Sequence, residues 1–432
     1  MKRQWWLTGI IVAGLFAAMR MAPLGAKEVT TGENEEIYKE LELFEHALSI
    51  VRSDYVEEPQ AKDLIYGALK GMLGTLDPYS QFLDPDSYTE LKVDTEGEFG
   101  GLGIEITIKD DLLTVITPID DTPAYKAGLL AGDRIVKIDG ELTRGITLME
   151  AVKKLRGKPK TTVKLTVFHE GETELKEVVL ERAIITIQSV READLVEDHI
   201  AYIRLSDFRE KTTEDLDAVI KRLEDEQMDS LILDLRNNPG GLLDVAISVS
   251  ELFLNRHQLI VTTKGRLRNQ NQEMRARING PVSDLPLVVL INEGSASASE
   301  IVAGAIQDHH RGVVMGTKSH GKASVQTIFP LKDGSALRLT TSKYFTPSGR
   351  SIHGQGIIPD VEVPFERPPD EKQKGEQAKE LFDRVESQDK PGEKTAEGST
   401  DKKRLDNQLA RAVDLLKGIK VYQTKEKAEA VN

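Results

Sequence analysis

The chain has 432 residues and a formal net charge of −14, and 39% of its residues are apolar and 30% charged. This length gives room for two or three domains, and the composition is that of a soluble protein in which disorder is only local. The acidic balance argues against nucleic acid as a partner, because a phosphate-binding surface needs clustered Lys and Arg. The absence of cysteine excludes a thiol nucleophile, Cys-based zinc sites and disulfides.

Residues 1–26 have the pattern of an export signal. Lys2 and Arg3 precede an apolar run over residues 5–19, and a stretch of small residues ends at Ala26. The run is shorter than the roughly 20 apolar residues of a spanning helix, and an uncleaved membrane anchor is the alternative. In both cases we expect the rest of the chain to lie in the periplasm or another extracytoplasmic space.

Residues 27–93 are predicted to form a helical region. Apolar residues recur at steps of three and four in two segments, which is the spacing of amphipathic helices. They are Ile37, Leu41, Phe44, Leu48 and Val51 in the first segment and Leu64, Ile65, Ala68, Leu69, Met72 and Leu76 in the second. The second helix should end at Asp77-Pro78, since a residue before proline avoids the helical region.

Residues 94–183 form a second, β-rich module in this interpretation. Short runs of β-favouring residues alternate with turns, and a short helix is expected near Leu148–Leu155. The expected strands are Gly103–Ile108, Leu113–Thr117, Arg134–Ile138 and Thr162–His169.

Residues 184–365 alternate strands with helices, which predicts an α/β core with a mostly parallel sheet. The expected strands are Ile200–Leu205, Ser230–Leu235, Leu287–Ile291 and Val313–Met315, and the expected helices are Thr213–Glu226, Leu242–Phe253 and Ala298–Asp308.

The end of the chain is predicted to be a polar linker over 366–402 and a C-terminal helix within 403–432. The helix carries an apolar stripe, Leu405, Leu409, Val413 and Leu416. This stripe could join a homodimer interface together with the N-terminal helix, or it could fold back onto the chain's own core.

Ser297 is the first candidate for chemistry. The apolar run Leu287–Ile291 leads through small residues directly into a helix, and substrates bind at strand ends in α/β folds. Ser297 would sit at the helix N-terminus, where unpaired N–H groups and the helix dipole favour developing negative charge. Helix capping is the other role of a serine at this position. Residues 294–298 do not form the Gly-x-Ser-x-Gly pattern of a nucleophile elbow.

A serine nucleophile needs a base, and two kinds are available. His309, His310, His320 and His353 would allow a Ser-His-Asp triad. Lys322 is the other candidate, since a desolvated lysine loses its proton near working pH. Gln326 could then orient the amine without raising its pKa as a carboxylate would.

Three longer motifs resemble the carboxy-terminal processing proteases, which are tail-specific serine peptidases. One joins Gly294–Glu300, Asp308 and Gly321–Gln326, and the others are Asp234–Gly241 and Leu339–Ile352. The resemblance extends from about Leu64 to Val363 and implies an endopeptidase that uses no metal or organic cofactor.

The resemblance implies a role for each matching residue. Ser297 becomes the nucleophile, Lys322 the general base and Gln326 the orienting partner. The oxyanion hole would consist of the Ala298 N–H and an N–H of Gly240 or Gly241, because glycine lets the backbone approach the scissile carbonyl. The resemblance also implies three supporting residues, Arg236, Glu300 and Asp308.

The β-rich module resembles a PDZ domain. The segment that resembles its carboxylate-binding loop and the start of its groove strand is Gly100, Gly101, Leu102, Gly103 and Ile104. Backbone N–H groups of such a loop hold a terminal carboxylate while the peptide adds a strand to the sheet edge. The expected partners are therefore protein or peptide C-termini, and the module would recognise substrate C-termini, gate the peptidase activity, or do both. A scaffold with an inactive core and a Ser-His-Asp hydrolase remain the alternative functions.

Overall fold

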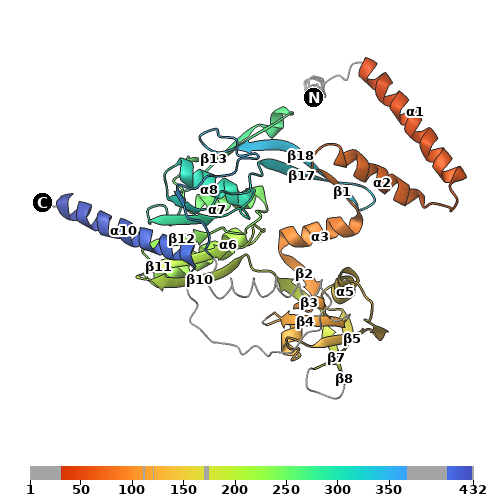
Figure 1. Ribbon diagram of the computed structural model, residues 1–432, viewed down its shortest axis with the longest axis horizontal. Coiled ribbons are helices and arrows are strands. Elements are labelled where there is room, and N and C mark those ends of the chain that lie inside the picture. Colours follow the sequence, from red (N-terminus) through yellow and green to blue (C-terminus); the bar gives the residue numbers. More distant parts are fainter. Residues whose placement is uncertain (1–30, 110–111, 120, 170–174, 367–405, 431–432) are drawn as a thin grey trace, which may run out of the picture. The chain divides into compact units, whose positions relative to one another are not determined.

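The computed structural model describes residues 31–109, 112–119, 121–169, 175–366 and 406–430 (Figure 1). The expected signal sequence and most of the expected polar linker lie outside these residues. The chain divides into two compact units, residues 1–72 and 73–432, and each is considered by itself.

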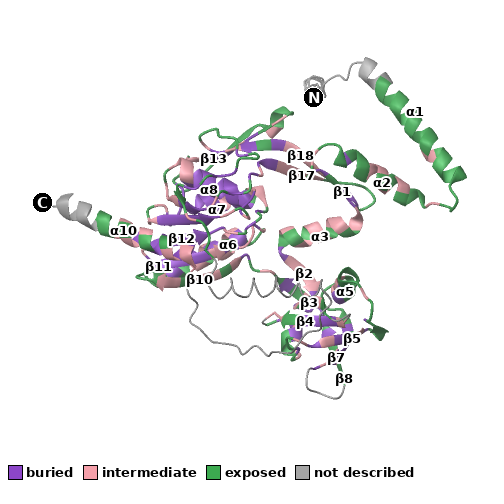
Figure 2. Cartoon of the chain, viewed as in Figure 1, coloured by how far each residue is buried: buried purple, intermediate pink, exposed green. Residues whose placement is uncertain are grey.

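The described part of the first unit is helical, as the apolar spacing predicts. It contains α1 (Thr31–Asp54) and most of α2 (Ala61–Gly74). The apolar stripe of α1 is exposed: Ile37, Leu41 and Phe44 keep 55%, 54% and 43% of their surface. Figure 2 shows α1 exposed along nearly all of its described length.

A six-stranded sheet forms the centre of the second unit and has the predicted parallel pairing. Its order is β10-β11-β12-β15-β16-β19, with only β10 antiparallel. The strands are β10 (Val190–Glu197), β11 (Ile200–Leu205), β12 (Ser230–Asp234), β15 (Leu287–Ile291), β16 (Val313–Gly316) and β19 (Val361–Glu362).

Helices cover both faces of this sheet, because its strands are apolar on both sides. Leu231, Leu233 and Val289 pack with α6 (Thr212–Asp225), α7 (Leu243–Glu251) and α8 (Ala298–Asp308). The alternate residues, such as Ile232 and Val288, belong to a second cluster on the opposite face.

The C-terminal helix α10 (Asn407–Ala430) packs in that second cluster. Leu409, Val413 and Leu416 are 6%, 3% and 0% exposed. The structure therefore shows the folding-back alternative for this stripe, and these three side chains are not available to another molecule. Leu405 lies outside the described residues.

A second, antiparallel sheet lies within the same unit and was not predicted. Its path is β1-β18-β13-β14, and β17 also pairs with β18. The strands are β1 (Gln81–Leu83), β13 (Leu259–Gly265), β14 (Gln272–Arg275), β17 (Ser324–Pro330) and β18 (Ala336–Phe345), and the short helix η1 (Arg268–Gln270) joins β13 to β14. These strands carry many polar, half-buried residues, so no continuous apolar run marks them.

The β-rich module is reached through α3 (Pro85–Glu96), most of which lies in the helical region predicted over 27–93, although no separate helix was predicted there. Its main sheet has the order β3-β4-β5-β7-β8, with β6 paired to β5, and a separate pair joins β2 to β9. The strands are β2 (Glu98–Gly101), β3 (Ile104–Lys109), β4 (Leu112–Pro118), β5 (Arg134–Ile138), β6 (Glu141–Leu142), β7 (Thr162–Phe168), β8 (Leu175–Glu181) and β9 (Ala183–Thr186), and the helices are α4 (Pro123–Lys126) and α5 (Leu148–Leu155).

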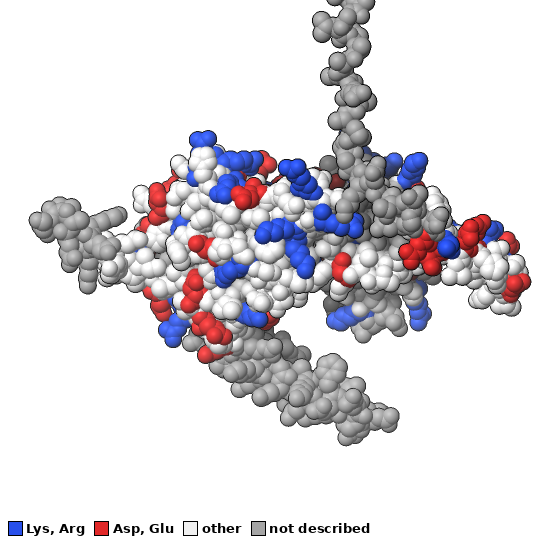
Figure 3. Space-filling model, turned by 90° about the horizontal axis from the view of Figure 1, so that it is seen from above, with Lys and Arg blue, Asp and Glu red and all other residues white. Residues whose placement is uncertain are grey.

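The described surface carries charges of both signs. Acidic and basic side chains are interspersed on the face drawn in Figure 3, the arrangement of a solvated surface. Of the helices that the structure describes, none has both the length and the apolar character that crossing a membrane requires.

Candidate active site

Ser297 lies where β15 turns into α8, at the end of the central sheet. Its backbone is at φ 55° and ψ −112°, a left-handed conformation that is strained for a residue with a side chain. The two neighbouring serines are fully buried, and their hydroxyls donate to backbone carbonyls: Ser295 to Leu235 at 2.7 Å and Ser299 to Asn238 at 2.9 Å. Ser297 alone of the three is not buried.

Glu300 joins the serine segment to the lysine segment. Its buried carboxylate accepts two N–H bonds at Oε2, from Ser297 and from Lys322, each at 2.9 Å. Its Oε1 accepts from the Gly321 N–H at 2.7 Å and the Ser319 hydroxyl at 2.5 Å. One carboxylate thus holds the backbone of both catalytic candidates, a role that the sequence motif did not reveal.

Lys322 occupies an environment that favours its neutral form. Burial lowers the pKa of the Lys322 amine, the positive charge of Arg338 lowers it further, and the more weakly acting Glu300 opposes them. The Nζ atom lies 4.8 Å from the centre of the Tyr79 ring. An amine whose pKa is lowered by burial and by Arg338 loses its proton more readily than a free lysine, and in its neutral form it can accept a proton from a serine hydroxyl.

A cavity of about 370 Å³ brings Ser297 and Lys322 together. Gln326, Arg338 and Tyr344 line it, together with α3 residues Leu91 and Thr95, the turn Pro239–Leu243, Ala298, Ile301, Ser324, Val325 and Ile328. None of the described residues that line it is a histidine, Asp or Glu.

None of the four candidate histidines lines this cavity. His309 follows the far end of α8 and its Nε2 is 2.7 Å from the Leu259 carbonyl oxygen, and His310, His320 and His353 are exposed. The geometry therefore offers Lys322, rather than a histidine, as the base for Ser297.

The predicted oxyanion turn lies directly beside the serine. A Cβ placed on Gly240 would be 2.8 Å from both Ser297 Cβ and the Ala298 nitrogen, and Gly240 has φ +98°. The Gly240 N–H already donates to Asn238 Oδ1 at 2.9 Å. The Gly241 N–H is directed away from Phe208, because the Gly240 carbonyl in the same trans peptide unit accepts from the Phe208 N–H.

Two residues that the sequence did not single out hold this arrangement. The Asn238 carbonyl accepts from the Ala296 N–H at 3.0 Å, which ties the turn to the serine loop. The Tyr344 hydroxyl lies within hydrogen-bonding distance of two carbonyl oxygens, that of Lys322 and that of Ser297, the latter at 3.0 Å. Tyr344 falls inside the Leu339–Ile352 motif, but its contacts bridge distant segments and are not visible in a local pattern.

Two of the predicted supporting residues do not contact Ser297. Arg236 pairs with Asp234 at 2.6 Å and with Asp406, just before α10, at 2.9 Å. Asp308 is at the far end of α8, where it accepts from the Ser348 N–H at 2.8 Å. Arg236 thus links the oxyanion turn to the C-terminal helix, and Asp308 holds the turn after β18.

Two of the glycines expected in the carboxylate-binding loop lie in a strand instead. Gly100 and Gly101 pair with β9 in β2, and a Cβ on Gly100 would lie 2.0 Å from the Gly157 oxygen. The carbonyls of Leu102 and Gly103 accept from the Ala124 and Ile119 N–H groups.

The direction of those two carbonyls fixes the direction of two N–H groups. Within a trans peptide unit the N–H is opposite the carbonyl, so the Gly103 and Ile104 N–H groups are directed away from the 119–124 turn. They stand at the start of β3, an edge strand of its sheet to which a peptide strand can be added.

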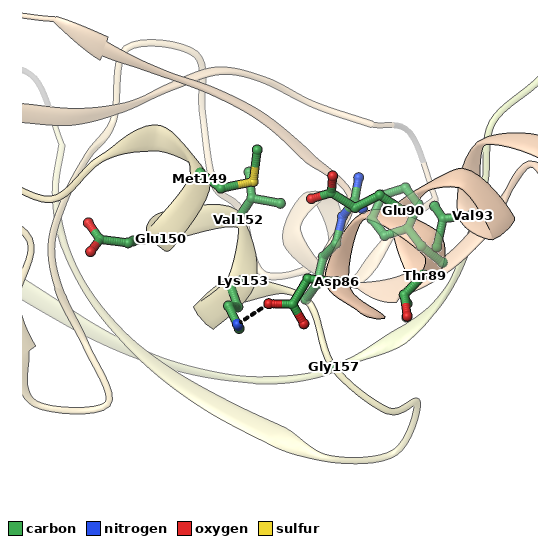
Figure 4. A pocket seen from close by; sticks show the side chains of 12 residues that line it. Asp86, Thr89, Glu90, Val93, Met149, Glu150, Val152, Lys153 and Gly157 are labelled. Carbon is green, nitrogen blue, oxygen red and sulfur yellow. Dashed lines mark hydrogen bonds and ion pairs between the residues drawn. The ribbon is translucent and has the colours of Figure 1, made fainter. Parts of the chain in front are cut away.

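A separate cavity of about 550 Å³ lies between α3 and α5 (Figure 4). The Lys153 amine and the Asp86 carboxylate form an ion pair across it at 2.7 Å. The Arg156 guanidinium, which also lines it, is 4.5 Å from the centre of the Phe99 ring. Neither Ser297 nor Lys322 contributes to this cavity.

Known families match three consecutive parts of the chain. Peptidase family S41 matches residues 199–363, the PDZ domain matches 100–180, and the N-terminal domain of the activating protease CtpB matches 10–87. The fold is accordingly that of an S41 peptidase with a PDZ domain.

Curated relatives narrow this class. A carboxy-terminal-processing protease of Bartonella bacilliformis is 47% identical over 84% of this chain and 83% of its own length. A carboxyl-terminal-processing protease of Picosynechococcus sp. is 38% identical over 73% of this chain and 77% of its own. The chain therefore belongs to the carboxy-terminal-processing proteases of family S41.

Among solved structures, a photosystem II D1 C-terminal processing protease is 31% identical, with a TM-score of 0.44 over 74% of this chain and 86% of its own.

Proposed function

We propose that this protein is a serine endopeptidase in which Ser297 is the nucleophile and Lys322 the general base. The main support for this proposal is Glu300, whose carboxylate accepts hydrogen bonds from the backbone N–H groups of both residues. Two further observations support it: Ser297 and Lys322 line one cavity, and burial lowers the pKa of the lysine.

The proposed reaction has two halves. The neutral Lys322 amine takes the proton of the Ser297 hydroxyl as Oγ attacks the scissile carbonyl carbon, and the resulting ammonium gives that proton to the leaving amine. We assign the oxyanion to the N–H groups of Ala298 and Gly241. Water then attacks the acyl-enzyme by the same route and releases the new C-terminus.

Single substitutions distinguish this mechanism from its alternatives. Ser297→Ala and Lys322→Ala should each abolish cleavage of a flexible peptide while circular dichroism stays native. The double variant should be no worse than either single one, because the pair acts as a unit. Activity in Lys322→Ala together with its loss in His309→Ala would support a Ser-His-Asp mechanism, and an inactive wild type would support a scaffold.

We further propose that the PDZ domain binds the free C-terminus of the substrate. The Gly103 and Ile104 N–H groups at an edge strand support this. Hydrogen bonds to a charged carboxylate are worth about 1.5–3 kcal/mol each, so an amidated substrate should be cut at least about tenfold more slowly than its free acid.

A Gly103 variant provides the control for this test. Gly103 has φ +75°, and a Cβ there would lie 2.3 Å from Thr122, so Gly103→Val should distort the loop and displace its N–H groups. The free-acid and amidated substrates should then be cut at equal rates. Equal cleavage by the wild type would show that the domain does not read the terminus.

Export and assembly complete the proposal. We propose an exported protein that processes C-terminal regions of other exported proteins, from the charged and apolar pattern of residues 2–26. N-terminal sequencing of the protein recovered from the extracytoplasmic fraction would distinguish a cleaved signal from a retained anchor. Full-length chain in the cytoplasm would contradict export.

We propose a homodimer that uses the exposed apolar stripe of α1. Light scattering should give twice the mass of one chain, and Leu41→Asp should give monomers. A monomeric wild type at micromolar concentration would rule the dimer out.

A further inference from the structure

The Gln326 side chain uses only one end of its amide. Its Nε2 donates to Thr340 Oγ1 at 2.9 Å and to Ser324 Oγ at 3.3 Å. Its Oε1 is buried and accepts no hydrogen bond from the described residues. Leaving a buried carbonyl oxygen unpaired costs about 1–3 kcal/mol. Because Gln326 also lines the active-site cavity, an amine of that cavity that approaches Oε1 would supply the missing hydrogen bond.

The Thr340 hydroxyl determines which end of the Gln326 amide is directed toward Thr340. Gln326 and Thr340 are opposite each other in the β17–β18 pair. Thr340 Oγ1 donates its single proton to Asp77 Oδ1 at 3.1 Å. It can therefore only accept from Gln326, so the amide must present its nitrogen to Thr340 and its oxygen to the other side.

Asp77 is fixed as an acceptor. Its carboxylate accepts from the N–H groups of Tyr79 and Ser80, each at 2.8 Å, and from the Ser80 hydroxyl at 2.7 Å. Burial would raise the pKa of Asp77, but these bonds and that of Thr340 outweigh it and lower the pKa. A carboxylate without a proton cannot donate to Thr340, so the direction of the bond cannot reverse.

We propose that Asp77 is a positioning residue of the peptidase site: through Thr340 it orients the Gln326 amide so that Oε1 accepts from the Lys322 amine. This rests on the proposed role of Lys322. Asp77 precedes β1, so the segment ahead of the PDZ domain would contribute to the chemistry of Ser297 and Lys322, which follow that domain.

The same segment contacts Lys322 itself. Its Nζ lies 4.8 Å from the Tyr79 ring centre, and the Tyr79 carbonyl accepts from Arg338 Nε at 3.2 Å. A ring face attracts the ammonium but not the neutral amine. The ring therefore holds the protonated side chain, and Gln326 Oε1 is the partner that remains for the amine during catalysis.

Thr340→Val tests this relay with little change of shape. Steady-state kinetics of the full chain on a flexible fluorogenic peptide should show kcat at least about tenfold lower and KM within about twofold of wild type. Thr340→Ser keeps the hydroxyl and should retain kcat. Thr341→Val is the matched control, because the Thr341 hydroxyl pairs with Thr327 at 2.6 Å on the other face of the strand.

The pH profile separates positioning from simple damage. An amide oxygen accepting from Lys322 favours the ammonium, so its loss should move the acid limb of kcat about one unit lower. Loss of folded enzyme would lower the plateau without this shift. If Thr340→Val has a much lower melting temperature than the wild type, the same pH profile is measured on Thr340→Ala.

The kinetic results distinguish failure of the Asp77–Thr340–Gln326 relay from failure of the Ser297 mechanism. Wild-type kcat and an unmoved acid limb in both Thr340→Val and Thr340→Ala, with Ser297→Ala inactive, would overturn the relay alone. A lower plateau with an unmoved limb would also overturn it, since that is the result of damage. An active Ser297→Ala would overturn both proposals.

Discussion

Replacing Glu300 by glutamine should disable the site by removing two of the four hydrogen bonds that its carboxylate accepts. All four partners are donors: the N–H groups of Ser297, Lys322 and Gly321 and the hydroxyl of Ser319. An amide has one accepting oxygen, so its NH₂ must face two other donors. Bonds to a charged group are worth about 1.5–3 kcal/mol each, which gives a loss of about 3–6 kcal/mol.

That loss is large compared with the strain stored at Ser297. A residue held at φ 55° costs about 1–3 kcal/mol, so without Glu300 the serine backbone can relax. Since about 1.4 kcal/mol is tenfold in rate, we expect kcat to fall by about 100-fold or more. The melting temperature should fall by about 10 °C.

The assay is kcat on a fluorogenic peptide, with thermal melting followed by circular dichroism. Glu293→Gln is the matched control: its exposed carboxylate lies four residues before Ser297 and accepts only from Thr317, at 3.0 Å, among the bonds described. It should change neither quantity. A Glu300→Gln enzyme with kcat within threefold of wild type would refute the bridging role.

Three further predictions concern other parts of the site. Arg338→Gln removes a positive charge that lowers the Lys322 pKa, so that pKa should rise and the acid limb of kcat/KM should move to higher pH; an unmoved limb would contradict it. Leu416→Ala should destabilise the fold by about 2–5 kcal/mol in chemical denaturation, because this α10 side chain is fully buried; wild-type stability would mean that α10 does not stay docked. Gly240→Ala should reduce kcat to background in the peptide assay, since the added methyl would lie 2.8 Å from Ser297 Cβ. A wild-type kcat would show that this turn does not form the oxyanion hole.

Local patterns predicted the elements around Ser297 well. The bounds expected for β15 and α8 are those observed. Both elements are visible in one short segment, where an apolar run is followed by small residues and then by apolar residues at helical spacing. The matches to peptidase family S41 and to the PDZ domain then confirmed the peptidase and PDZ assignments.

Contacts between distant segments could not be predicted in this way. Asp77 and Thr340 are 263 residues apart, and the pairing of β1 with β18 brings their segments together. The β17–β18 hairpin has half-buried polar residues such as Gln326, so its pattern resembles a loop. Likewise, Gly100 was expected to bind a carboxylate, whereas the structure explains it by its approach to Gly157.

The most direct test of the Ser297–Lys322 mechanism is mass spectrometry of the protein after reaction with a serine-reactive fluorophosphonate. We expect one adduct, on Ser297, that forms faster as pH rises through the lowered pKa of Lys322 and is not formed by Lys322→Ala. Ser295 and Ser299 should remain unmodified, because both are buried. An adduct on either of them, or undiminished labelling of Ser297 in Lys322→Ala, would contradict the Ser297–Lys322 mechanism.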